Sequence, residues 1–269
     1  MPFRYNKVLV IGATSGIGLA LSEKFVAEGS SVVATGRRKE NLDDLVKQHK
    51  GKIDTVVFDI TKLKDIPKFV TEVFAKHSDI DCVLLNAGIQ RHLQWQKPEN
   101  VDLDLLETEF TTNYLSYMHL TKALLPHLQK QAPRETSLVY VTSGLALVPI
   151  MSCPNYCASK AALHHMVLAM RVQLKEIDSN VRIIELLPPA VQTELHDDKH
   201  QPEFKGRGRQ MGMPLNEFTE EAYAGLNSDD NEQIPVQAVK QFMGFYDWEM
   251  ERQKKMMGMY EMQKKQQAQ

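Results

Sequence analysis

Short apolar stretches alternate with stretches of helical periodicity along most of this chain, and this alternation limits the fold more than any other feature. The apolar stretches are rich in β-branched residues and lie at residues 8–11, 31–35, 54–58, 82–85, 138–141 and 181–187. Most are continuous rather than alternating in polarity, as in strands buried on both faces of a parallel sheet. Helical stretches lie between them, at residues 16–28, 39–49, 63–77, 103–131 (two helices or one bent helix) and 155–178. This order predicts an α/β fold, a doubly wound parallel sheet of about seven strands with helices on both faces.

The chain is predicted to form a single domain over residues 1–269. Its length allows one large or two small domains, but no Gly/Ser-rich or Pro-rich linker interrupts the alternation. Residues 190–235 depart from it because they are polar and irregular. Residues 240–269 form a predicted C-terminal helical extension, in which Met243, Met250 and Met257 recur every seven residues. We expect this helix to pack on the body of the protein or on a neighbouring subunit.

Composition argues against several classes of protein. Lys and Arg number 32 and Asp and Glu number 34, for a net charge of −2, whereas a nucleic-acid partner calls for a basic excess. No apolar run approaches the roughly 20 residues that cross a bilayer, so no membrane partner is expected. Cys82, Cys153 and Cys157 cannot all pair and lack the spacing of a zinc site, so no metal is expected. Reduced cysteines make a cytoplasmic location the default prediction.

Three glycines directly follow the first predicted strand and open the next helix. Gly12, Gly16 and Gly18 give the pattern G-x-x-x-G-x-G. Glycines allow a tight turn and close backbone approach, and the free N–H groups at a helix start attract a pyrophosphate. In this position the loop predicts a dinucleotide site. The loop residues that are also expected to contact the dinucleotide are Thr14, Ser15 and Ile17.

The end of the second predicted strand carries cations. An acidic residue about 20 residues past the glycines would bind the 2′-OH of an adenosine ribose, whereas a 2′-phosphate needs a cation. The sequence there reads Gly36, Arg37 and Arg38, with no carboxylate. Because a guanidinium offers a planar fork to phosphate, NADP(H) is predicted as the cofactor. Arg37 is expected to be the main determinant and Arg38 the secondary one.

Four residues form a candidate catalytic set. Tyr156 and Lys160 are four apart on a predicted helix, so their side chains share a face. An ammonium group beside a phenol lowers the phenol's pKa from about 10, which suits acid–base catalysis. Ser143 follows the fifth predicted strand, at the sheet edge where α/β ligands bind, and Asn113 lies within 103–131. Together with the glycine loop, this set resembles the Asn-Ser-Tyr-Lys tetrad of the short-chain dehydrogenase/reductase family over residues 7–195.

The resemblance implies a Rossmann-like fold and a role for each member of the set. Ser143 would hydrogen-bond the developing alkoxide and Tyr156 would donate a proton. Lys160 would tune Tyr156 and hold the ribose, and Asn113 would position a water that links Lys160 to solvent. The reaction implied is reversible hydride transfer between NADPH and a carbonyl or secondary alcohol of a small to medium organic substrate. The further cofactor contacts implied are Asp59 and Ile60 at the adenine, Asn86, Ala87 and Gly88 at its ribose, and Pro188, Val191 and Thr193 at the nicotinamide, with Pro189 replacing a family glycine.

Residues 190–235 lie where the family carries its substrate lid. An apolar cover of the substrate is expected from Phe204, Met211, Met213 and Phe218. The basic residues Lys205, Arg207 and Arg209 either meet an anionic group or are solvated. Candidate pocket residues elsewhere are Gln90, Leu145, Cys153, Tyr156 and Gln192. The family also implies a homodimer or homotetramer built through the helices at 103–131 and 155–178.

Two other functions stay open. One is a non-redox enzyme of the same fold, such as an isomerase or cyclase, whose usual mark is loss of Tyr156 or Lys160. The other is a regulatory protein that binds NADPH. Following NADPH absorbance across a panel of ketones and aldehydes separates all three, because binding without turnover favours the latter two.

Overall fold

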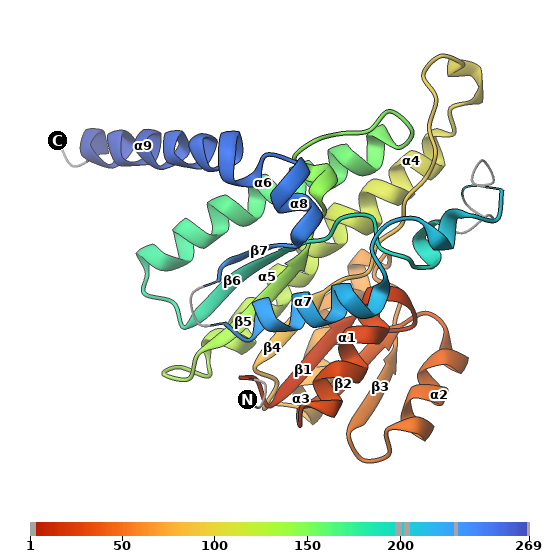
Figure 1. The fold of residues 1–269 in the computed structure, drawn as a ribbon. Coiled ribbons are helices and arrows are strands. Elements are labelled where there is room, and N and C mark those ends of the chain that lie inside the picture. Colours follow the sequence, from red (N-terminus) through yellow and green to blue (C-terminus); the bar gives the residue numbers. More distant parts are fainter. Residues whose placement is uncertain (1–3, 197–200, 202–204, 229–230, 268–269) are drawn as a thin grey trace.

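Seven parallel strands form one sheet in the computed structural model, which describes residues 4–196, 201, 205–228 and 231–267 (Figure 1). The strands are β1 (Lys7–Ile11), β2 (Ser31–Gly36), β3 (Ile53–Val57), β4 (Cys82–Leu85), β5 (Thr136–Val141), β6 (Val181–Leu187) and β7 (Gln233–Pro235). Their order across the sheet is β3-β2-β1-β4-β5-β6-β7. The winding therefore reverses between β1 and β4, where open α/β sheets bind ligands at the carboxyl ends of the strands. The predicted doubly wound parallel sheet is confirmed.

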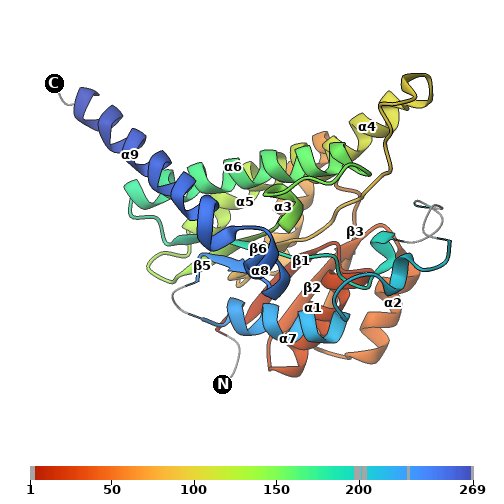
Figure 2. The ribbon, with the colours of Figure 1, turned by 45° about the horizontal axis from the view of Figure 1, so that its top comes forward.

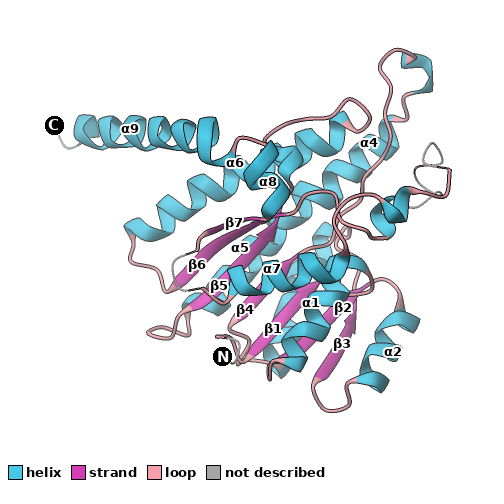
Figure 3. Cartoon of the chain, in the orientation of Figure 1, coloured by secondary structure: helices cyan, strands magenta, loops and turns pink. Residues whose placement is uncertain are grey.

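Helices cover both faces of the sheet (Figures 1 and 3). One face carries α1 (Gly16–Ala27), α2 (Lys39–Gln48) and α7 (Leu215–Leu226), and the other carries α3 (Ile66–Lys76), α5 (Ser116–Gln129) and α6 (Pro154–Glu176). Strand β1 shows why both faces are covered. Val8 and Val10 are buried against the first set of helices, and Leu9 and Ile11 are buried against the second. Alternate residues of a strand face opposite sides, so a continuously apolar strand buries both.

A π-helical turn joins two helices in the stretch 103–131. Helix α4 (Leu103–Phe110) continues into α5 through the turn Thr111–Leu115, without a loop. The turn contains Asn113, whose side chain is completely buried. Single π turns inside α-helices occur often at functional sites, and this one faces the segment that follows β4.

The expectation of an irregular segment over 190–235 is wrong for its second half. Residues 215–226 form α7 and residues 233–235 form β7. Phe218, expected over the substrate, is completely buried in the core beside α1, and Met213 packs against the same cluster. Phe218, Ala222 and Leu226 recur every four residues, a helical spacing that signals this buried face. Phe204 lies outside the described residues.

The C-terminal residues are helical and lie against α6. They comprise α8 (Gln237–Phe242), a π turn (Phe245–Glu249) and α9 (Met250–Gln267). Helix α9 crosses α6 of the same chain and extends beyond the sheet (Figure 2), with Lys264 Nζ 3.2 Å from Glu176 Oε1. None of the helices in the described part of the chain is long and apolar enough to span a membrane.

Candidate active site

A cavity of about 820 Å³ opens at the carboxyl ends of the strands, where the winding reverses. It collects nearly all of the predicted site residues from segments far apart in the sequence. Of these, Gly18 and Asn113 do not line it. Those that do are Gly12, Thr14, Ser15, Gly16, Ile17, Arg37, Arg38, Asp59, Ile60, Asn86, Ala87, Gly88, Ser143, Tyr156, Lys160, Pro188, Val191 and Thr193.

The glycine loop is packed too tightly for any larger residue at two positions. Gly12 has a φ of +93°, and a Cβ there would lie 2.7 Å from the backbone of Ala87. A Cβ on Gly18 would lie 2.1 Å from the carbonyl oxygen of Gly12, which also accepts a hydrogen bond from Asn86 Nδ2 at 3.0 Å. The first turn of α1 therefore stays at the cavity wall, with Gly16 and Ile17 in the lining. This arrangement fits the pyrophosphate of a dinucleotide.

The two arginines at the end of β2 differ in their partners. Arg38 donates to Thr14 Oγ1 at 3.0 Å, and its guanidinium lies 2.7 Å from the carboxylate of Glu194. Arg37 is exposed at the cavity rim and makes no side-chain hydrogen bond or ion pair with the residues that the structure describes. Arg38 thus braces the glycine loop, whereas the charge of Arg37 is available to a ligand. Glu194 could not be predicted as a partner of Arg38, because it follows β6 and lies 156 residues from that arginine.

Three of the candidate catalytic residues meet at one wall of the cavity. The phenol of Tyr156 lies near enough to Ser143 for the two side chains to interact. Ser143 Oγ accepts a hydrogen bond from the backbone N–H of Leu145 at 3.1 Å. Lys160 Nζ donates to the carbonyl oxygen of Val141 at 2.8 Å and lies 5.7 Å from the centre of the Tyr156 ring. The end of β5 and the first turns of α6 therefore bring a serine hydroxyl, a phenol and an ammonium group together.

The pKa of Tyr156 departs from expectation. Burial raises the pKa of this phenol, the interaction with Ser143 opposes the rise, and the expected lowering by Lys160 is not found. Burial also lowers the pKa of Lys160 to about 8. At neutral pH the pair is therefore a neutral phenol beside a mostly protonated amine. This is the protonation state that a proton donor requires.

Asn113 holds the backbone that passes the site. Its Oδ1 accepts from Ile89 N at 3.0 Å, while its Nδ2 donates to Ile89 O at 2.9 Å and to Ser159 Oγ at 3.1 Å. Both amide hydrogens are engaged, so the side chain cannot donate to a water as well. Its Oδ1 keeps a second lone pair, so the positioning of a water by Asn113 stays a prediction. Asn113 thus fixes the backbone that follows Gly88. It also lies close to Gly88 itself, because a Cβ on Gly88 would be 3.3 Å from Asn113 Oδ1.

Most of the residues predicted to form the substrate pocket line the cavity. The candidate residues Gln90, Leu145, Cys153 and Tyr156 line it, as does Met211. Gln192 does not, because its Nε2 donates to the carbonyl oxygens of residues 210 and 212, each at 3.2 Å. The side chain of Gln192 therefore stabilises the loop rather than facing the cavity.

The basic residues of the loop and the C-terminal segment contribute unequally to the lining. Arg209 lines the cavity, whereas Lys205 and Arg207 are exposed and do not. Met243, from the C-terminal segment, also lines it. The seven-residue recurrence of methionines had marked Met243 as part of a packing stripe but not as a site residue.

The cysteines and acidic residues provide no metal site within the described ranges. No group of three or more His, Cys, Asp or Glu side chains is placed there to hold an ion. Cys82, Cys153 and Cys157 are buried free thiols. Gln90 Nε2 donates to Cys153 Sγ at 2.8 Å, so this thiol is part of the polar lining.

Comparison with known proteins identifies the class. Residues 6–203 match the family of short chain dehydrogenases, so the chain belongs to the short-chain dehydrogenase/reductase family. It is 34% identical over 210 residues to the uncharacterized oxidoreductase DltE of Bacillus subtilis, covering 77% of this chain and 81% of the relative. It is 31% identical over 213 residues to the 3-oxoacyl-[acyl-carrier-protein] reductase FabG of Thermotoga maritima, covering 78% and 83%. The protein is therefore an enzyme of the dehydrogenase/reductase type.

Solved structures support the same conclusion. A short chain dehydrogenase from Burkholderia cenocepacia, crystallised in complex with NADP, superposes with a TM-score of 0.73 at 25% identity. The match covers 90% of this chain and 92% of that one. The glycine loop, the start of α1 and the residues after β4 form the cradle that a nicotinamide dinucleotide needs.

Proposed function

We propose that this enzyme transfers hydride reversibly between NADPH and a carbonyl or secondary alcohol carbon of a small to medium organic substrate. One observation carries the proposal. Ser143, Tyr156 and Lys160 line the same cavity, the phenol of Tyr156 interacts with Ser143, and Lys160 lies one helical turn from Tyr156. Two hydroxyl donors beside an ammonium group suit a reaction in which negative charge develops on a substrate oxygen.

The residues divide the chemistry between them. A reduced nicotinamide supplies the hydride when it is bound. Ser143 donates a hydrogen bond to the substrate carbonyl oxygen, and Tyr156 transfers its proton to that oxygen as the alcohol forms. Lys160, as an ammonium, stabilises the phenolate that Tyr156 becomes. Burial of all three groups strengthens these interactions, because the local dielectric constant is low.

The preference for NADP(H) rests on Arg37. Its guanidinium lies at the rim without a partner among the described residues, whereas Glu194 neutralises Arg38. A 2′-phosphate therefore meets a free cation, and no carboxylate stands at the end of β2 to bind a ribose 2′-OH. The NADP complex of the Burkholderia cenocepacia relative is consistent with this preference.

The decisive experiment follows NADPH absorbance at 340 nm with a broad panel of ketones and aldehydes, for the wild type and for Tyr156→Phe. We expect turnover of at least one ketone and its near loss in the variant. NADPH binding without turnover of any panel member would instead favour the isomerase, cyclase or regulatory alternative. Turnover that survives Tyr156→Phe would contradict the assignment of the proton donor.

Cellular location and assembly stay predictions from the sequence. The proposal is a cytoplasmic enzyme that acts as a homodimer or homotetramer. Ala158 and Ala169 are exposed on α6, and their small side chains would let a second subunit approach this helix closely. Light scattering coupled to size exclusion measures the mass directly.

A further inference from the structure

The C-terminal segment packs on the turn that carries Ser143. A Cβ on Gly144 would lie 2.3 Å from Met243 Sδ and 2.9 Å from Val239 Cγ2, so a larger residue there would displace the Met243 side chain. Around it, an apolar cluster joins the turn and the end of β6 to the C-terminal segment. The members of this cluster are Leu147, Leu187, Val239, Phe245, Met243 and Met250. Met243 also lines the cavity, so the segment forms part of its wall.

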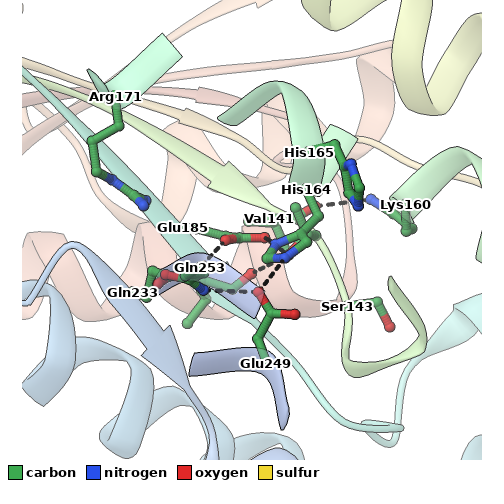
Figure 4. A network of polar contacts seen from close by, with 12 residues as sticks. Val141, Ser143, Lys160, His164, His165, Arg171, Glu185, Gln233, Glu249 and Gln253 are labelled. Atoms are coloured by element: carbon green, nitrogen blue, oxygen red, sulfur yellow. Dashed lines mark hydrogen bonds and ion pairs between the residues drawn. The ribbon is translucent and has the colours of Figure 1, made fainter. Parts of the chain in front are cut away.

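A buried chain of charged groups holds the segment in place (Figure 4). His164 Nδ1 lies 2.7 Å from Glu185 Oε1, and His164 Nε2 lies 3.0 Å from Glu249 Oε1. All three side chains are completely buried. They come from α6, from β6 and from the π turn before α9. Glu249 is the only one of the three that the C-terminal segment supplies.

Two members of this buried chain, Glu185 and His164, adjoin catalytic residues. Thr142 donates from Oγ1 to Glu185 Oε1 at 2.8 Å, and Thr142 directly precedes Ser143. His164 lies one helical turn after Lys160 on α6. A displacement of Glu249 therefore acts on the two elements that hold the catalytic hydroxyl and amine.

Further side chains reach the two carboxylates, and Arg252 Nη2 lies 2.7 Å from Glu249 Oε2. Gln233 Nε2 donates to Glu185 Oε2 at 3.0 Å. Arg252 and Gln253 donate to Glu249 Oε1 at 2.9 and 2.8 Å. Removal of Glu185, His164 or Glu249 would leave a buried charge without its partner, which is energetically costly. The C-terminal segment is thus fixed by a directional contact in addition to apolar packing.

We infer that the C-terminal segment is a functional part of the active site. Met243 is a specificity-determining residue that limits the size of the substrate. Glu249 is a positioning residue that holds Met243 and the Ser143 turn in place through His164 and Glu185. This inference rests on the proposed carbonyl reduction.

The size limit is tested with 2-butanone and 2-acetonaphthone as a small and a large ketone. In Met243→Ala we expect kcat/KM for the large ketone, relative to the small one, to rise about 10-fold, as for pocket changes of a few methylenes. Met243→Leu should stay close to the wild type because it conserves volume. Met259→Ala, at an exposed site on α9, is the matched control. An unchanged ratio in Met243→Ala would overturn the role of Met243.

The positioning role is tested with Glu249→Gln, using Glu251→Gln on the exposed side of α9 as control. Hydrogen exchange of the backbone amides at residues 143–148 should accelerate about 10-fold in Glu249→Gln alone, since a loosened turn opens more often. Its kcat should fall while the KM for NADPH stays unchanged. Glu249→Asp, which keeps the charge, should recover most of the lost kcat. If Glu249→Gln matches Glu251→Gln in exchange and kcat, the inference is refuted.

These readouts separate the inference from the proposed function. If the wild type reduces no ketone, the proposed function fails, yet hydrogen exchange still decides the role of Glu249. Equilibrium dialysis of 2-acetonaphthone in the presence of NADP⁺ then measures the size limit without turnover. Tighter binding of 2-acetonaphthone to Met243→Ala than to the wild type supports the size limit set by Met243, and equal binding overturns it.

Discussion

The buried imidazole of His164 should make the stability of this enzyme depend on pH above neutrality. Burial alone would lower the pKa of His164, but the carboxylates of Glu185 and then Glu249 raise it from 6.5 to about 9. The folded protein therefore holds this proton more tightly than the unfolded chain. Its contribution to stability is fully present below pH 6.5 and is lost as the pH rises through about 9.

The magnitude follows from the two pKa values. Each unit of difference is worth about 1.36 kcal/mol, so the move from 6.5 to about 9 corresponds to about 3 kcal/mol. Solvent screening takes little from this value, because the His164 side chain is completely buried. Other charges act around the chain, since Arg252 contacts Glu249 and Arg171 acts on Glu185. Both are arginines, which keep their charge throughout this pH range.

The assay is urea unfolding of the wild type and of His164→Gln at pH 6.5, 8 and 10. The variant is needed because the pKa of Lys160 is lowered by burial, so the titration of Lys160 raises stability between about pH 8 and its ordinary 10.5, in the opposite sense. The difference between the two proteins removes this effect. We expect the advantage of the wild type to shrink by about 3 kcal/mol between pH 6.5 and 10. A difference that stays constant over that range would refute the charged state assigned to His164.

Five other predictions concern the cavity. Tyr156→Phe should lower kcat by roughly 10²–10⁴-fold, the usual contribution of a proton donor, with the KM for NADPH unchanged in steady-state kinetics. Arg37→Ala should raise the KM for NADPH and leave that for NADH unaltered. Arg38→Ala should weaken both cofactors and lower the Tm, because it removes the brace between Thr14 and Glu194. Gly18→Ala should abolish binding of NADPH in a fluorescence titration, because its Cβ would lie 2.1 Å from the Gly12 carbonyl oxygen. The kcat for reduction should fall as the pH rises through about 8, where Lys160 loses the proton that stabilises the Tyr156 phenolate, and a profile flat to pH 10 would contradict this.

Local patterns predict most of the fold, because each strand and helix is set by residues close in sequence. The six apolar stretches correspond to β1–β6, and the parallel pairing follows from their continuous burial. Strand β7 escapes prediction because it has only three residues, Gln233–Pro235. Helix α7 escapes because the glycines and prolines before it mask the spacing of Phe218, Ala222 and Leu226.

Some residues of the candidate site could likewise be predicted from local patterns, and others could not. Gly12, Arg37 and Tyr156 could be found because each lies in a short motif next to a predicted strand or helix. Glu194 could not, because its importance comes from Arg38, which no local pattern connects to it. The pKa of Tyr156 was misjudged for a related reason, since spacing placed Lys160 near it but gave no measure of how strongly the site is buried.

Helix α6 shows why spacing alone misses the protonation states of this site. Lys160 and His164 lie four residues apart and are both deeply buried. Lys160 meets the Val141 carbonyl oxygen and, among the residues that the structure describes, no carboxylate within hydrogen-bond reach, so desolvation lowers its pKa. His164 lies between two carboxylates, one of them brought by a residue 85 positions away, so its pKa rises. The same helical spacing therefore yields opposite shifts, and the difference is set by the partners that the fold supplies. It follows that the C-terminal segment, through Glu249, helps to fix the charge one turn from the catalytic lysine.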